Sequence, residues 1–119
     1  MRVLTLLTPL CLLVSAAEPL QQNLDAPGGG HFAITLSACR DKAPQLNGYL
    51  TNHTGRNWLY AEIQVKVTHG NQTETYRLNL ERIPANGRAI RQAIDGAANQ
   101  DCESFRLGNL ELIAAQPQN

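Results

Sequence analysis

The strongest constraint on the fold is the alternating sequence on either side of Gly70-Asn71. In residues 59–67 every second side chain is apolar and those between are mostly polar, which predicts a strand with one buried face. Gly70-Asn71 is typical of a two-residue hairpin turn, since both residue types tolerate a positive φ. Pairing His69 with Gln72 then keeps the apolar residues of both strands on one face. The predicted pairs are Val65 with Tyr76, Ile63 with Leu78, and Ala61 with Leu80.

A preceding strand, residues 46–52, is expected to pair with this hairpin through a loop at residues 53–56. Leu50 then faces Leu59 on the buried side. The whole stretch from residue 46 to residue 80 is predicted to form three consecutive antiparallel strands.

This pairing places three aromatic rings, those of Tyr49, Trp58 and Tyr60, on the outer face of the sheet. Exposed aromatic side chains often anchor interfaces, so these three residues form the candidate binding face. The alternative is that a loop or a terminal segment covers the rings, because large apolar patches seldom stay exposed.

Residues 1–17 have the pattern of a secretory signal peptide: a charged start at Arg2, an apolar run over residues 3–14, and small residues before a cleavage site after Ala17. The run is too short for a permanent membrane anchor, and we expect no transmembrane segment in the mature chain. The protein is therefore predicted to be secreted or periplasmic.

The charge and cysteine content narrow the class further. Without the signal peptide, nine basic side chains stand against ten acidic ones, a balance that does not favour nucleic acid as a partner. The mature chain keeps two cysteines, Cys39 and Cys102, which we expect to form one structural disulfide in an exported domain. The competing interpretation, a redox or metal pair, lacks a CxxC companion.

The remaining segments define the boundaries of one domain over residues 31–114. Residues 18–30 include three consecutive glycines and lack periodicity, which predicts a flexible leader. Residues 115–119 are expected to be a polar tail. Further alternating segments predict strands at 31–39, 88–94 and 105–114, the last with a bulge at Gly108-Asn109.

Short strands separated by turn signals, with no long helical pattern, predict an all-β fold. We expect an antiparallel immunoglobulin-like β-sandwich of about six to seven strands, with a small barrel as the alternative.

Residues 46–55, LNGYLTNHTG, followed by an alternating strand and the turn at residues 83–87, IPANG, resemble the FxLYD-type immunoglobulin-like domains of exported bacterial proteins. The resemblance covers residues 45–114, and at the place of the aromatic-x-Leu-Tyr-Asp signature this chain has residues 65–69, VKVTH. Membership would imply an extracytoplasmic binding or accessory module without catalytic residues.

Catalytic motifs are not evident, and no cofactor is expected. The chain has three histidines, of which His53 and His69 flank the middle strand at opposite ends, so we expect no shared metal. We therefore expect a non-catalytic module that binds an unknown protein or cell-surface component. The alternative is a small secreted enzyme or inhibitor that acts through loop residues, for which a pocket with Asp101, Glu103 and a histidine would be required.

Two N-glycosylation sequons, at Asn52 and Asn71, are predicted to lie in exposed turns. Their occupancy depends on whether the host glycosylates its exported proteins.

Overall fold

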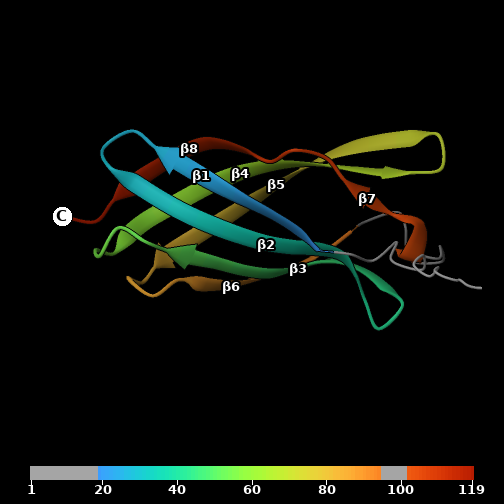
Figure 1. Cartoon of the computed structure of the whole chain (residues 1–119), viewed down its shortest axis with the longest axis horizontal. Coiled ribbons are helices and arrows are strands. Elements are labelled where there is room, and N and C mark those ends of the chain that lie inside the picture. The colour runs from blue at the N-terminus through green and yellow to red at the C-terminus, as the bar shows by residue number, and fades with distance from the viewer. Residues whose placement is uncertain (1–18, 95–101) are drawn as a thin grey trace, which may run out of the picture.

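The computed structural model describes residues 19–94 and 102–119, so the predicted signal peptide and residues 95–101 lie outside the described residues. Strands dominate this part of the chain (Figure 1). The elements are β1 (Leu20–Ala26), β2 (Gly30–Arg40), β3 (Ala43–Asn52), β4 (Trp58–His69), β5 (Gln72–Ile83), β6 (Arg88–Ala93), the short 3-10 helix η2 (Cys102–Ser104), β7 (Arg106–Leu107) and β8 (Glu111–Pro117).

The strands form two antiparallel sheets that pack face to face (Figure 1). The first sheet has the order β1-β2-β3-β6, and in the second sheet β4 lies between β5 on one side and β7 and β8 on the other. The predicted antiparallel β-sandwich is confirmed, with about eight strands instead of six to seven. Among the described residues, no helix has the length and hydrophobicity needed to cross a bilayer.

The β4–β5 hairpin has the predicted register. His69 lies opposite Gln72, and the ladder continues through the predicted pairs without a shift. Of the two turn residues only Gly70 has a positive φ, 60°, which is the arrangement of a turn with glycine at its first central position. The alternation of apolar residues therefore determined the pairing and the buried face together.

The predicted pairing of β3 with β4 is wrong. β3 pairs with β2 and β6, and the chain crosses from the first sheet to the second between Asn52 and Trp58. Asn52 is buried, and its side-chain amide donates hydrogen bonds to the carbonyls of Arg56 (2.7 Å) and Pro84 (2.9 Å). We call residues 53–57 the crossover loop. These bonds tie it to the turn between β5 and β6, so the loop does not close a hairpin.

The flexible leader predicted for residues 18–30 is also wrong. Residues 20–26 form β1, an edge strand paired with β2 over its full length, and only residues 27–29 form the turn. Gln22 occupies a position of the inward set and uses both ends of its amide: Nε2 donates to the Leu110 carbonyl at 2.7 Å, and Oε1 accepts from the Leu110 N–H at 3.0 Å. Because Gln22 is polar but lies among the inward-facing residues, the alternation of β1 was not visible in the sequence.

The C-terminal segment is interrupted where the sequence predicted. β7 and β8 both pair with β4, and residues 108–110 between them belong to neither strand. The polar tail predicted for residues 115–119 is wrong in part, because β8 continues to Pro117.

The core lies between the two sheets and takes side chains from nearly every strand. Phe32, Leu36, Leu50 and Ile63 are representative, each at most 2% exposed. The predicted disulfide between Cys39 and Cys102 joins the end of β2 to η2, with the two Cα atoms 5.4 Å apart. It fixes the beginning of the C-terminal segment to the first sheet.

Candidate functional site

The three aromatic residues predicted as a binding face are not brought together. Tyr49 is 40% exposed on the outer side of the first sheet, whereas Tyr60 is half-buried on the second. Trp58 is 0% exposed and belongs to the core. The shared face is therefore wrong, because it depended on the pairing of β3 with β4.

Trp58 instead closes one end of the core. Its ring meets Phe32 edge to face at 5.2 Å between centroids, and its indole N–H donates to the Thr54 hydroxyl at 2.9 Å. That hydroxyl donates in turn to Oδ1 of Asn52 at 2.6 Å. A Cβ at Gly30 would lie 2.8 Å from the indole, so the absence of a side chain there makes room for the ring.

The two sequons have opposite environments. Asn52 is 5% exposed with both protons of its amide engaged, so the folded chain has no room for a glycan on this nitrogen. Asn71 is exposed in the β4–β5 turn, as predicted.

His69 and His31 lie in different environments. His69 is 6% exposed, contacts Glu74 at 3.3 Å and packs on Phe105 with 4.7 Å between ring centroids. His31 lies on the surface, 2.9 Å from Asp25. In residues 19–94 and 102–119, no three His, Cys, Asp or Glu side chains are grouped so that they could hold a metal ion. Asp101 of the alternative enzyme site lies outside the described residues.

A different site appears at Leu59, next to Trp58 on β4. Trp58 lies opposite Pro117 of β8, and Tyr60 lies opposite Gln116, so Leu59 is the extra residue of a β-bulge. The bulge turns Leu59 outward, and its side chain is 45% exposed instead of facing Leu50 as predicted.

The strand on the other side of Leu59 is irregular as well. In β5, Arg82 has a φ of 58°, in the left-handed region that non-glycine residues rarely adopt. The ladder pairs Trp58 with Ile83 and Tyr60 with Glu81, and Leu59 and Arg82 lie between these two pairs. Both strands thus leave regular alternation at the same level of the sheet, and one side chain of each points to solvent.

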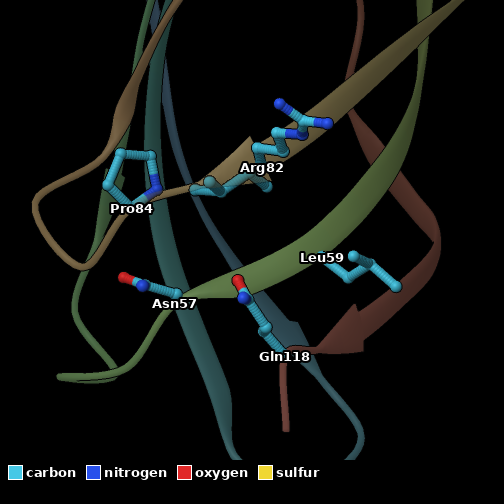
Figure 2. A pocket seen from close by; sticks show the side chains of 6 residues that line it. Asn57, Leu59, Arg82, Pro84 and Gln118 are labelled. Atoms are coloured by element: carbon cyan, nitrogen blue, oxygen red, sulfur yellow. The ribbon is translucent and has the colours of Figure 1, made fainter.

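Two shallow hollows flank this pair of residues, and Figure 2 shows side chains that line the first of them. One, of about 230 Å³, lies toward the end of the sandwich, where Leu59 comes from β4, Arg82 from β5 and Gln118 from the segment after β8. Asn57, Ile83 and Pro84 complete its lining. The other, of about 320 Å³, lies on the outer face of the sheet and is lined by Leu59, Tyr60, Glu81 and Arg82. We call the two hollows together the Leu59 site.

The chemistry of the Leu59 site is that of a contact surface. Within the described part of the chain, the Arg82 guanidinium has no carboxylate within 4.0 Å, and Leu59 and Pro84 present apolar surface beside it. The site can therefore receive an apolar side chain next to a carboxylate. The described lining contains no histidine, cysteine or serine.

Sequence reasoning missed this site because Leu59 fits the alternating set of β4. One signal could have revealed it: the apolar residues Leu78, Leu80 and Ile83 of β5 change parity after Leu80. A change of parity in a strand indicates a bulge, and a bulge turns neighbouring side chains to new directions.

No protein-family model, curated protein or solved structure matches this chain.

Proposed function

We propose that this protein is a non-catalytic, exported binding module and that the Leu59 site is its contact surface. The observation that carries the proposal is the exposed Leu59 beside Arg82, which has no ion-pair partner among the described residues, at a point where both strands depart from regular geometry. Local backbone strain and β-bulges in native proteins concentrate at functional sites. The signal-like sequence at residues 1–17 and the disulfide support the exported compartment.

The ligand that fits is a segment of a partner protein that presents an apolar side chain and a carboxylate. Leu59 supplies apolar area to be removed from water, and the planar guanidinium of Arg82 suits a carboxylate in a bidentate geometry. Arginine is enriched among residues that dominate binding energy at interfaces, and a leucine beside it adds water exclusion.

Site-specific photocrosslinking in the native extracytoplasmic fraction tests the proposal. A benzoylphenylalanine placed at position 59 is expected to form an adduct with one partner chain, and Arg82→Glu is expected to reduce the adduct at least about tenfold because it opposes a carboxylate. The matched control is the same probe at position 49, where Tyr49 is exposed to a similar degree on the other sheet.

Equal adducts at positions 59 and 49, or an adduct at position 59 that Arg82→Glu leaves unchanged, would reject the Leu59 site. The melting temperature of each variant is measured alongside, since an unfolded variant would lose the adduct for a different reason.

A further inference from the structure

β5 and β6 are edge strands of the two sheets that line one hollow together, and they differ. β5 runs for twelve residues, Gln72–Ile83, with β4 as its one neighbour among the described residues. Its ladder with β4 shows no register shift, and its irregularity is confined to Arg82 near the end. A long, regular edge of this kind can accept a further strand.

In the first sheet, the edge strand beside this hollow is β6, which is shorter, with six residues. Ile90 points into the core, so Arg88, two positions away, belongs to the inward set yet is exposed at the edge. An inward-pointing charge and a short length are devices that oppose edge pairing. Between the two edges lies a hollow of about 280 Å³, lined in part by Leu78, Leu80 and Ile90, so described residues do not fill the space beside β5.

The charges of β5 are arranged so that the strand complements itself. On its outer side Arg77, Asn79 and Glu81 follow each other at alternate positions and are exposed, while Leu78 and Leu80 point inward. In an antiparallel pair of identical strands centred on Asn79, Arg77 lies opposite Glu81 of the second copy, and Leu78 lies opposite its Leu80. Opposite charges that face each other across an antiparallel pair are stabilising, and like charges are destabilising.

We propose that β5 pairs with β5 of a second copy of this chain around a two-fold axis at Asn79. The interface is isologous, since the same strand serves both copies, and it joins the two second sheets into one continuous sheet. Glu81 has no ion-pair partner within its own described chain, and Arg77 keeps 56% of its side chain exposed although it pairs with Glu62. Both groups are thus available to the second copy.

Neighbouring registers fit less well. The buried faces of both strands must stay on one side of the joined sheet, so each residue can pair only with a residue whose number has the same parity. The two-fold axis can therefore pass through any single residue of β5. A centre at Arg77 or at Glu81 places like charges opposite each other. A centre at Leu78 or Leu80 loses both pairs between Arg77 and Glu81. The register centred on Asn79 alone satisfies charge and apolar matching together.

A single cysteine tests this register. Directly opposed residues of an antiparallel pair have Cα atoms about 4.5 to 5.5 Å apart, which suits a disulfide. Asn79→Cys meets its own copy at the two-fold axis, whereas the matched control Thr75→Cys, exposed on the same side of β5, lies opposite Ile83 of the second copy. After mild oxidation, non-reducing electrophoresis is expected to show a covalent dimer for Asn79→Cys at least about tenfold more abundant than for Thr75→Cys. Equal yields, or no dimer for either variant, would overturn the register.

Charge reversal tests the pairing in the native chain. Arg77→Glu and Glu81→Arg each place two like-charged pairs across the interface, and each is expected to weaken association in sedimentation at low salt at least about tenfold. The double variant restores opposite charges across the interface and is expected to recover association, although the ion pair between residue 77 and Glu62 stays lost. Association that is indifferent to the single reversals would refute the proposal. So would a chain that stays monomeric at every concentration, which would leave the edge to an extended segment of another protein.

Discussion

The two ends of β4 have similar polar connections in the sequence but very different structures. At the crossover loop, Asn52 and Trp58 are buried and joined through the Thr54 hydroxyl, and the loop is tied to Pro84. At the hairpin end, residues 70–75 are all exposed. One connection joins two sheets and must cover the core, while the other only reverses a strand within a sheet. The comparison predicts that mutations at the crossover loop cost far more stability than mutations at the hairpin end.

The largest effect is expected for Trp58→Ala. Removing a fully buried indole leaves a cavity beside Phe32 and removes the donor to Thr54, so the free energy of unfolding should fall by about 3 to 5 kcal/mol. Chemical denaturation measures it, with Tyr49→Ala as the exposed aromatic control. A loss of unfolding free energy below about 1 kcal/mol would indicate that Trp58 lies on the surface, as the sequence predicted.

Asn52→Ala is expected to follow, with a loss of about 1 to 3 kcal/mol, because the carbonyls of Arg56 and Pro84 and the Thr54 hydroxyl lose a buried partner. Its control is Asn71→Ala, the other sequon asparagine, which is exposed and should change stability by less than about 0.5 kcal/mol. Denaturation curves of the two variants compare the same amino acid at the two ends of β4. Equal losses would contradict the difference between the ends.

The comparison also shows which parts of the fold the sequence determines locally. The register of β4 and β5 could be predicted because a two-residue turn and two alternating strands agree with each other. The partner of β3 could not, because residues 46–52 alternate equally well for either sheet. The choice rests on bonds such as that from Asn52 to Pro84, 32 positions away. Local patterns cannot contain that information.

The same limit applies to β1 and to the Leu59 site. β1 was missed because Gln22 stands where an apolar residue would show the period, and its use depends on Leu110, 88 positions away. Leu59 was assigned to the core because a bulge is defined by the partner strand, in this case by Pro117 and Gln116 of β8. The strand predicted at residues 31–39 is present as β2, since the alternation of Phe32, Ile34 and Leu36, all buried, is visible without knowledge of a partner strand.

At the hairpin end, Gly70→Ala should have a smaller effect than either crossover variant. Gly70 has a φ of 60°, and an added Cβ meets no atom within 4 Å, so the cost is confined to the backbone conformation, about 1 kcal/mol. Thermal unfolding of Gly70→Ala beside Asn52→Ala measures the difference. A larger loss from Gly70→Ala than from Asn52→Ala would contradict the prediction that mutations at the crossover loop cost more stability than mutations at the hairpin end.

The smallest effect on stability is expected at Leu59, one residue from the largest. Leu59 is 45% exposed because the bulge directs it outward, so truncation removes little buried area, and Leu59→Ala should change the free energy of unfolding by less than about 0.5 kcal/mol. The same variant should weaken partner capture if the Leu59 site is the contact surface. Denaturation and capture measured on one variant separate the two roles. A loss of stability near that of Trp58→Ala would mean that Leu59 packs in the core as the alternation of β4 suggests, and the bulge would then have no function in binding.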